Sequence, residues 1–465
     1  MSDTPRPLAG RHVHFNGLGG KGIAPAAALA HQAGMRVSGD DLDSNHRTHA
    51  LSGEGVDVTL GTNTAPTGAE YLVATGALPR DNHSAGPRRM ARLAFVRHLL
   101  AAHGKRQIAV AGSLGKSTAA ALLHRVLAPL NPSAYIGADV PGLLCGGQLA
   151  DGEWAVVEAC EYQGAYRALA PEIVIALNLI QNHEDVFGPG TSGFERSLAG
   201  FLTEAPVPPR LAVLPEEVAA LLAPRLAGHR ALTLQTVGED ADWSIDVTAA
   251  DPTGTTFRLA QHGTHAGTWT VPAAGRHLVT AAACALVTSL HLGIAPADSA
   301  DALAGFRLPR RRMSTMHHDD HLVLVDDNAR QPGQAAALLQ ALRQAHPDRH
   351  LVIAVAPWGR KNQRDVPAWA LGLSEADTVW VLPVGDAAVP GGEAPDANVR
   401  LTELIRLEGT PAYAISAGGD LPLPPDRDGK GLLVATAGYD ASPAAFSALH
   451  DQAIAAYGAD ATAVA

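Results

Sequence analysis

The chain has 465 residues, of which 46% are apolar, 17% are charged and 5% are aromatic. This composition is typical of globular domains, and the length is sufficient for about two to four of them, each with its own core. The formal net charge of -11 and the isoelectric point near 6.0 exclude a broad basic face for nucleic acid. Substrate phosphates must therefore be held locally.

The three cysteines, Cys145, Cys160 and Cys284, are odd in number and widely spaced. They predict neither a disulfide framework nor a zinc site. The N-terminus has no apolar core of signal-peptide length, and no uninterrupted apolar run reaches the roughly 18 residues that span a membrane. We expect a cytoplasmic protein, a monomer or homodimer, that acts on small molecules and binds neither nucleic acid nor membrane.

The first predicted unit is a strand, a helix and a second strand. An apolar strand at residues 12–15 precedes the glycine-rich turn at residues 17–22, and a strand at residues 35–38 leads to Asp41. An acidic residue about 20 positions after such a turn predicts that the turn binds a diphosphate at a helix N-terminus. Because the glycine pattern alone is a weak signal, a purely structural turn is the alternative. The predicted substrate contacts are Gly17, Gly19, Gly20, Gly22 and Asp41.

Two further strands, at residues 58–60 and 71–75, and a helix at residues 90–103 complete this region. A strand-to-helix turn then begins the second region with the sequence QIAVAGSLGKST, residues 107–118. Its glycines let backbone N–H groups point at one anion, Lys116 supplies positive charge for the β- and γ-phosphates, and Ser117 supplies an oxygen for Mg²⁺. The predicted nucleotide contacts are Gly112, Ser113, Leu114, Gly115, Lys116, Ser117 and Thr118.

This loop is shorter than G-x-x-x-x-G-K-[ST], because Val110 occupies the position of the first glycine, so an ordinary turn remains an alternative. The strand at residues 154–157 ends at Glu158 and leads to Glu161, where a carboxylate beside a phosphate loop is placed to hold Mg²⁺. The strand at residues 173–177 leads through Asn178 to His183. A metal or phosphate role for His183 is favoured over a surface histidine.

The remaining predicted elements again alternate between strands and helices. Strands at residues 211–214 and 232–237, a hairpin within 242–269 and a helix at residues 278–291 complete the second region. A linker at residues 306–312 leads to the third, whose predicted strands are 321–325, 351–356 and 378–382, with a helix at 333–345. Alternating strands and helices predict parallel α/β sheets. The cluster of histidines and aspartates at residues 317–321 is metal-like in composition, but neighbours on an extended chain point to opposite faces, which disfavours a site.

The order of glycine-rich turn, phosphate loop and Asp-Asp strand end resembles that of the Mur ligases, over nearly the whole chain. The resemblance is closest to the UDP-N-acetylmuramate:L-alanine ligase branch. The H-F-x-G-[IL]-G-G-x-G start of that branch is matched by residues 14–22, and its S-G-x-D by residues 38–41. Its A-G-T-H-G-K-T-T loop is matched by residues 111–118, with Ser113 and Leu114 in place of Thr-His.

Later motifs of this branch follow in the same order. E-A-D-E is similar to residues 158–161, T-N-I-x-x-D-H-x-D to residues 177–185 and G-R-H to residues 275–277. R-R-F corresponds to residues 311–313, and D-D-Y-A-H-H-P corresponds to residues 326–332.

Other positions depart from the family. Cys160 and Asn182 stand where the branch has aspartates, and Leu278 and Ala281 replace two asparagines. Residues 328–334 replace Y-A-H-H-P-T-E, which removes two histidines and a glutamate. We therefore expect a retained scaffold and phosphate chemistry with changed acceptor and amine pockets.

The resemblance implies a three-domain α/β architecture and implies ATP and Mg²⁺ as cofactors. A Rossmann-like domain (1–104) would bind a UDP-type acceptor, a central P-loop ATPase-like domain (105–311) would bind ATP, and a Rossmann-like domain (312–465) would close over ATP and the amine. The implied catalytic residues are Lys116, Glu161, His183, Arg312 and Asp327. The implied metal ligands are Ser117, Glu161 and His183, the further nucleotide contacts are Asn178 and His277, and a further substrate contact is Arg330.

The sequence therefore predicts an ATP-dependent ligase that phosphorylates a carboxylate and transfers the acyl group to an amine. The changed motifs favour a specialised ligase, in a peptidoglycan-like or natural-product pathway. The alternatives are an authentic UDP-N-acetylmuramate:L-alanine ligase and a non-catalytic nucleotide-binding homologue. A dehydrogenase is disfavoured because it would leave residues 112–117 without a purpose.

Overall fold

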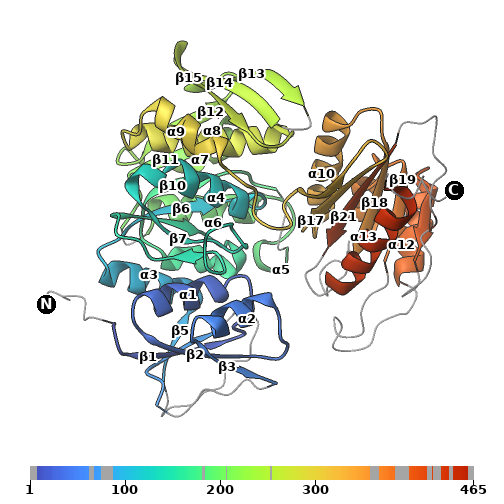
Figure 1. Cartoon of the computed structure of the whole chain (residues 1–465). Helices are drawn as coiled ribbons and strands as arrows, with labels where there is room; N and C mark the ends of the chain where they lie inside the picture. The colour runs from blue at the N-terminus through green and yellow to red at the C-terminus, as the bar shows by residue number, and fades with distance from the viewer. Residues whose placement is uncertain are drawn as a thin grey trace, which may run out of the picture. The chain divides into compact units, whose positions relative to one another are not determined.

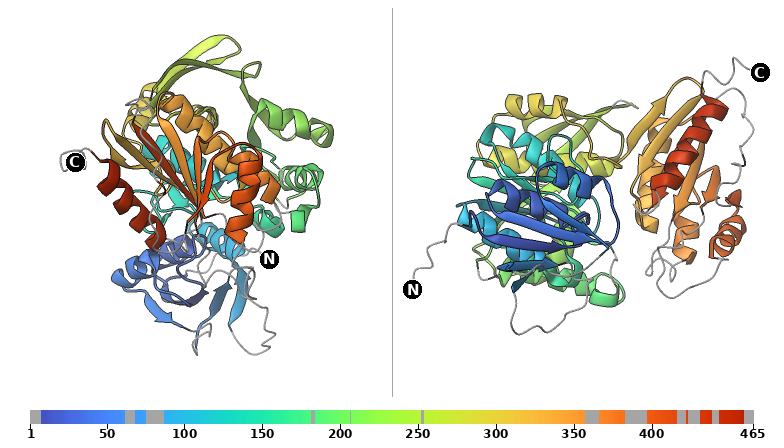
Figure 2. Two further views of the ribbon diagram at one scale, coloured as in Figure 1. Left: turned by 90° about the vertical axis from the view of Figure 1, so that its right-hand side faces the viewer. Right: turned by 60° about the horizontal axis from the view of Figure 1, so that its bottom comes forward.

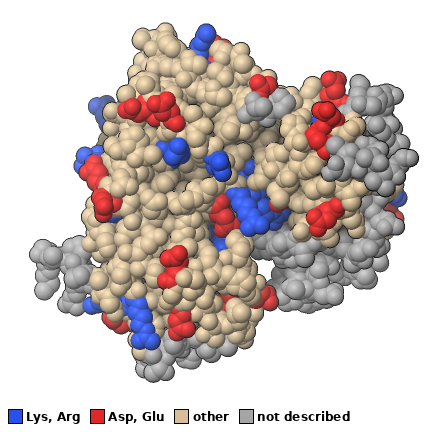
Figure 3. Space-filling view, viewed as in Figure 1, with Lys and Arg blue, Asp and Glu red and all other residues tan. Residues whose placement is uncertain are grey.

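The computed structural model of the chain is a mixed α/β protein with three sheets (Figure 1). It describes residues 8–61, 68–74, 87–180, 184–205, 207–251, 254–356, 366–382, 397–415, 422, 431–438 and 443–458. Among these residues, no helix is both long and apolar enough to cross a membrane. On the face shown in Figure 3, Lys and Arg side chains are interspersed with Asp and Glu, so this face carries both signs of charge.

The N-terminal sheet has five described strands in the order β3-β2-β1-β4-β5, and its paired strands are parallel. The predicted strand–helix–strand start is confirmed, as is the helix predicted at residues 90–103. That helix begins at Arg92 because residues 88–91 form a strand that the sequence analysis missed. The strands are β1 His12–Asn16, β2 Arg36–Asp41, β3 Asp57–Leu60, β4 Tyr71–Ala74 and β5 Arg88–Ala91. The helices are α1 Ala24–Gln32, α2 His46–Gly53 and α3 Arg92–Ala102.

The central sheet has ten described strands in the order β15-β14-β13-β12-β11-β10-β6-β9-β7-β8. The strand before the phosphate loop, β6, lies between β10 and β9 and is parallel to both, which places the loop at the middle of the sheet's carboxyl edge. The predicted hairpin is confirmed and extended by a third strand. The first five strands are β6 Arg106–Ala111, β7 Ser133–Tyr135, β8 Gly147–Gln148, β9 Trp154–Glu158 and β10 Pro171–Ala176. The others are β11 Leu211–Pro215, β12 Thr233–Gly238, β13 Trp243–Asp251, β14 Gly254–Gln261 and β15 Thr264–Val271.

Helices connect and cover these strands. They are α4 Lys116–Val126, α5 Glu184–Phe187, α6 Ser192–Thr203, α7 Glu216–Leu226, α8 Arg276–His291 and α9 Pro296–Ala304, with 3₁₀ segments η1 Ala128–Leu130 and η2 Tyr162–Ala168. From the N-terminal sheet, α1 packs against β7 and β8, and α3 packs against η2, so these two helices lie between the two sheets (Figure 1). The glycine-rich turn before α1 therefore faces the central sheet.

The C-terminal sheet has six described strands in the order β16-β17-β21-β18-β19-β20, of which only the β16–β17 pair is antiparallel. Alternate residues of β17 and β18 face opposite cores: α10, α11 and α12 cover one face and α13 covers the other (Figure 2). The strands are β16 Ser314–His318, β17 Leu322–Asp327, β18 His350–Ala356, β19 Thr378–Val381, β20 Ala412–Ala414 and β21 Leu432–Gly438. The helices are α10 Pro332–Ala345, α11 Val366–Gly372, α12 Ala397–Leu407 and α13 Pro443–Tyr457.

The histidine- and aspartate-rich cluster forms the turn between β16 and β17. Asp319 accepts hydrogen bonds from the backbone N–H groups of His321 and Leu322 at 2.8 and 2.7 Å, and its other oxygen lies 2.6 Å from His317 Nε2. Asp319 therefore stabilises a tight turn, which explains the composition without a metal.

Two compact units make up the chain. One comprises residues 1–249, 256–272 and 278–310, with the N-terminal and central sheets, and the other comprises residues 250–255, 273–277 and 311–465. The N-terminal and central sheets thus share one compact unit, and the C-terminal sheet forms the other. The three sheets agree with the predicted three-domain α/β architecture, whereas the boundaries at residues 104 and 311 stay predictions.

Candidate active site

The phosphate loop follows β6, and its strand–turn–helix setting agrees with the prediction. Gly112 has φ 131°, which strains any residue with a side chain, and a Cβ there would crowd the Asn178 backbone nitrogen and Leu177 Cβ at 3.2 Å. Gly115 has φ 79° and directly precedes the first residue of α4. The two glycines thus permit a sharp turn that directs the positive end of the α4 dipole into the site.

The amide side chain of Asn178, just beyond β10, forms hydrogen bonds with the backbone of the phosphate loop. Its Oδ1 accepts hydrogen bonds from the N–H groups of Ser113 and Leu114 at 3.0 and 2.9 Å, and its Nδ2 donates to the Leu114 carbonyl at 3.0 Å. Ser113 Oγ donates to the Ile180 carbonyl at 2.7 Å and accepts from its N–H at 3.1 Å. The N–H groups of Ser113 and Leu114 are therefore engaged within the loop. The N–H groups of the first turn of a helix have no partner within it, so those at the start of α4 can bind an anion. A direct contact of Asn178 with nucleotide stays a prediction.

Lys116 and Glu161 form the charged centre of this edge of the sheet. Lys116 Nζ lies 2.8 Å from Glu161 Oε2 and donates to the Gly112 and Ser113 carbonyls at 2.7 and 3.1 Å. The Glu161 side chain is only 3% exposed, which places a negative charge in a largely dry site. Ser117, in the first turn of α4, is also buried.

Oxygen donors here fit Mg²⁺. This ion is usually held by one or two carboxylates together with substrate phosphates and waters, so Ser117 and Glu161 suffice as protein ligands. In the described part of the chain, no three His, Cys, Asp or Glu side chains converge to form a metal site of their own. His183, the third predicted metal ligand, lies outside the described residues.

The glycine-rich turn after β1 is closed by the acidic residues that end β2. Gly17 has φ 72°, the Leu18 N–H donates to the Asp40 carbonyl at 2.8 Å, and the Gly19 N–H donates to Asp41 Oδ2 at 2.7 Å. Asp41 thus stabilises the turn, and its predicted contact with substrate is untested. The sequence does not predict the adjacent buried pair, in which Asn16 Nδ2 donates to both oxygens of Asp40 at 2.9 and 3.0 Å.

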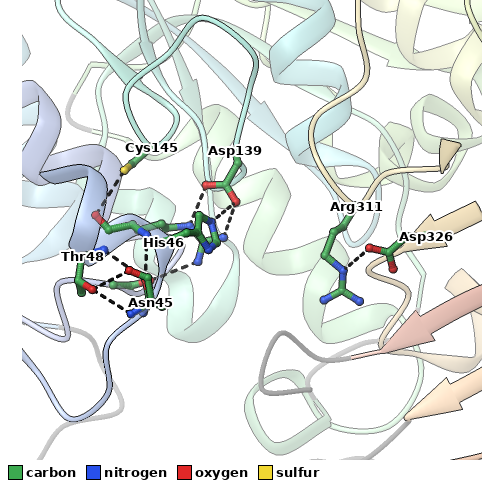
Figure 4. Close-up of polar contacts among 9 residues, drawn as sticks. Asn45, His46, Thr48, Asp139, Cys145, Arg311 and Asp326 are labelled. Atoms are coloured by element: carbon green, nitrogen blue, oxygen red, sulfur yellow. Dashed lines mark hydrogen bonds and ion pairs between the residues drawn. The ribbon is translucent and has the colours of Figure 1, made fainter. Parts of the chain in front are cut away.

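Arg47 ties this turn to the central sheet through Asp139, which is labelled in Figure 4. Its guanidinium donates to both carboxylate oxygens of Asp139, after β7, at 2.9 and 2.7 Å, and to the Gly19 carbonyl at 3.2 Å. His46 Nε2 lies 2.8 Å from Asp139 Oδ2, and the Cys145 thiol donates to the Arg47 carbonyl. Although burial disfavours the charged carboxylate, Arg47 and His46 outweigh it and lower the pKa of Asp139.

Asn45 and Thr48, on either side of Arg47 in the sequence, form a capping box at the start of α2 (Figure 4). The Arg47 N–H donates to Asn45 Oδ1 at 2.9 Å, so the cap fixes the backbone that carries Arg47. Asn45 and Thr48 are a sequence-level signal that the analysis overlooked, whereas nothing in the sequence pairs Arg47 with Asp139.

The predicted residues Arg312, Asp327 and Arg330 belong to the second unit. Asp327 is the last residue of β17, Arg330 follows that strand, and Arg312 precedes β16. Asp327 Oδ2 accepts a 2.8 Å hydrogen bond from the Met313 N–H; burial raises the pKa of this carboxyl, although Arg312 opposes the shift. Arg311 pairs with Asp326 at 2.9 Å (Figure 4). The Arg330 N–H donates to Gln334 Oε1 at 2.7 Å.

Asn328 and His277 are two further residues of the second unit. Asn328 is 1% exposed, and neither its amide nitrogen nor its oxygen has a hydrogen-bond partner among the described residues. His277 lies in the first turn of α8 with an exposed side chain. That His277, Arg312, Asp327 and Arg330 act together with the phosphate loop stays a prediction.

The comparisons with known proteins agree on one family. The Mur ligase family, catalytic domain, matches residues 12–107. The UDP-N-acetylmuramate–L-alanine ligase of Frankia casuarinae is 30% identical over 86% of this chain and 88% of its own length. That of Xanthomonas euvesicatoria is 31% identical, with 92% of each chain covered.

The fold has close counterparts among solved structures. The crystal structure of UDP-N-acetylmuramate–alanine ligase from Thermotoga maritima superposes with a TM-score of 0.78 at 20% identity, covering 95% of this chain and 99% of that one. The phosphate loop, the buried Lys116–Glu161 pair and the full-length relatives lead to one conclusion. The chain belongs to the Mur ligase family of ATP- and Mg²⁺-dependent ligases.

Proposed function

We propose that this ligase joins the carboxylate of a nucleotide-linked or similarly anionic acceptor to an amino acid or other amine, and that this amine differs from the L-alanine in the names of its relatives. The observation that carries the proposal is the Lys116–Glu161 pair, which lies beyond the carboxyl ends of β6 and β9. It supplies charge at a phosphate loop in the same compact unit as a glycine-rich turn suited to an anionic acceptor.

The chemistry follows from the poor reactivity of carboxylates toward amines. An acceptor carboxylate oxygen attacks the γ-phosphorus of ATP, ADP leaves, and an acyl phosphate forms. The amine nitrogen then attacks the carbonyl carbon, loses a proton, and expels phosphate. Lys116 and the N-terminus of α4 stabilise negative charge on the β- and γ-phosphates, which is the main demand of phosphoryl transfer. Ser117 and Glu161 hold Mg²⁺, which adds neutralising charge when bound.

The altered segment after β17 supports a changed amine. Residues 328–334 lack the two histidines and the glutamate of the family motif that they resemble. The Asn328 amide is buried without a hydrogen-bond partner among the described residues, which costs free energy. A hydrogen bond between this amide and the substrate would remove that cost. An amine with a polar group beside the reacting nitrogen fits this position better than L-alanine does.

An authentic UDP-N-acetylmuramate:L-alanine ligase is the second candidate. It is favoured by the relatives of that name, which match this chain over more than four-fifths of its length at about 30% identity.

Phosphate release by the full-length protein decides between the two. The assay supplies ATP, Mg²⁺ and UDP-N-acetylmuramate with either L-alanine or one of a panel of amino acids and polyamines. Our proposal expects release to depend on an amine other than L-alanine, with at least 10-fold higher kcat/KM. Comparable or better turnover with L-alanine would establish the second candidate, and release independent of any amine would contradict both.

A further inference from the structure

Arg92 lies where the glycine-rich turn of the N-terminal sheet meets the carboxyl edge of the central sheet. It is the first residue of α3, and its guanidinium packs so closely on Gly22 that a Cβ on that glycine would overlap Nη1. The Tyr135 hydroxyl, at the end of β7, donates a 2.8 Å hydrogen bond to the Gly22 carbonyl and is also bonded to Arg92. The guanidinium is further bonded to the thiol of Cys160, just after β9. Arg92 thus bridges the turn and two strand ends.

The charge of Arg92 is not balanced by a directly paired anion. Within the described residues, no carboxylate lies at ion-pair distance from its guanidinium, and its bonded partners are a phenol and a thiol. Glu158 is close enough to act on it electrostatically, but it accepts a 2.7 Å hydrogen bond from the Gly137 N–H. A partly buried cation without a bonded anion is costly, and a guanidinium has five N–H donors in a planar fork.

Burial opposes the charge on Arg92, but Tyr135, Cys160 and Glu158 outweigh it and raise its pKa. The guanidinium is therefore a permanent cation, with donors to spare for an anion that comes from outside the chain.

Arg92 is also connected to the phosphate loop. Cys160, its hydrogen-bond partner, directly precedes Glu161, and Glu161 is paired with Lys116 at 2.8 Å. A series of contacts therefore runs from Gly22 through Arg92 to the lysine of the phosphate loop. Arg92 therefore lies between the glycine-rich turn, where the acceptor would bind, and the phosphate loop, where the γ-phosphate would be transferred.

On the basis of the proposed function, we propose that Arg92 is a specificity-determining residue that pairs with the acceptor carboxylate and orients it toward the phosphate held at Lys116. Guanidinium and carboxylate match as a bidentate pair, which fixes direction as well as position. Cys160 contributes to this specificity. A thiol leaves the guanidinium available to substrate, whereas an aspartate there would compete for it.

Calorimetric titration of the full-length protein with two nucleotides tests this pairing. UDP-N-acetylmuramate carries the lactyl carboxylate, and UDP-N-acetylglucosamine lacks it. Wild-type protein is expected to bind the first about 10-fold or more tightly than the second, as expected for a hydrogen-bonded charge pair. Arg92→Gln should abolish this preference by weakening only the binding of UDP-N-acetylmuramate.

Two further variants separate recognition from a structural role. Cys160→Asp keeps Arg92 but supplies a competing anion, so it should also weaken binding of the carboxylate ligand selectively. Arg97→Gln, five residues further along α3, is the control and should leave both affinities unchanged. In turnover, Arg92→Lys should raise the acceptor KM several-fold while the ATP KM stays within about twofold, because an ammonium cannot form the bidentate pair.

The results that would overturn the assignment are distinct. If Arg92→Gln and Cys160→Asp weaken both nucleotides equally, or neither, Arg92 is a structural bridge. If wild-type protein binds neither nucleotide, the acceptor class of the proposed function is wrong, and the assignment falls with it. Tight, carboxylate-selective binding that is insensitive to Arg92 would leave the proposed function intact and remove only this inference.

Discussion

Lys116 Nζ lies 2.8 Å from Glu161 Oε2, so the cation of the phosphate loop and the carboxylate suited to Mg²⁺ neutralise each other in this structure. Both side chains are largely buried, and they lie beyond the carboxyl ends of two adjacent parallel strands, β6 and β9. When a triphosphate and Mg²⁺ bind, the two residues can exchange this mutual contact for opposite partners: phosphate oxygens for Lys116 and the metal for Glu161. The site thus avoids an isolated buried charge in both states.

Removal of the lysine charge should stop catalysis. We expect Lys116→Ala to lower kcat for phosphate release by at least about 100-fold, because the developing charge on the phosphates loses its main counterion. The variant also leaves Glu161 buried without its cation, so its melting temperature should fall, and circular dichroism at 25 °C checks that it remains folded. Arg258→Ala, which removes an exposed side chain from β14, is a charge-matched control. Phosphate release at the wild-type rate in the folded Lys116→Ala variant would eliminate this loop as the catalytic site.

Asn178 should matter through the loop that it holds. Asn178→Ala removes the acceptor of two loop N–H groups, at a cost of about 1–3 kcal/mol in stability if they find no other partner. A loosened loop should raise the ATP KM roughly 10-fold and change kcat less, since pre-organisation is lost before the chemical step. Steady-state kinetics with varied ATP measure this split. Asn398→Ala on α12 removes another local amide contact and should change neither constant. An unchanged ATP KM in Asn178→Ala would show that the loop keeps its shape without the amide.

The contact between Arg47 and Asp139 should make the first unit sensitive to acid. The pKa of Asp139 is lowered in the folded state, so its contribution to stability is present above its unfolded pKa, about 3.9, and is lost as the pH falls through the lower folded value. Asp139→Asn should therefore lower the melting temperature by several degrees at pH 7, because Arg47 stays buried without its anion. This difference from the wild type should shrink as the pH falls below about 4.

Scanning calorimetry between pH 3 and 8 follows both proteins. Asp246→Asn, at an exposed and distant ion pair of 3.9 Å, is the matched control. A difference between wild type and Asp139→Asn that stays constant to pH 3 would contradict the assigned role of the carboxylate.

Local patterns predicted the strands and the phosphate loop well, because hydrophobic runs and glycine turns act over a few residues. The strand Arg88–Ala91 was missed because its polar, exposed sequence carries no such pattern. The spacing to Asp41 correctly placed this carboxylate at the glycine-rich turn, but it could not show that the Gly19 N–H is its partner. The contacts of Arg47 with Asp139 and of Arg92 with Cys160 join residues more than 65 positions apart, and only the fold brings them together.

Asn328 allows a test of whether a buried polar group is kept for function. Asn328 is 1% exposed and its amide has no hydrogen-bond partner among the described residues, so Asn328→Leu, whose side chain has the same branching but is larger, removes an unsatisfied group. We expect a gain of about 1–3 kcal/mol in the stability of the second unit, visible as a higher melting temperature of the full chain. The amine KM should rise about 10-fold while the ATP KM stays constant, because the substrate loses the hydrogen bond that the amide is retained to make. Asn328→Asp, which keeps the acceptor but loses the donor, should lie between wild type and leucine in amine KM. A leucine variant that is no more stable and uses the amine as well as the wild type does would show that Asn328 is satisfied by water and has no part in amine binding.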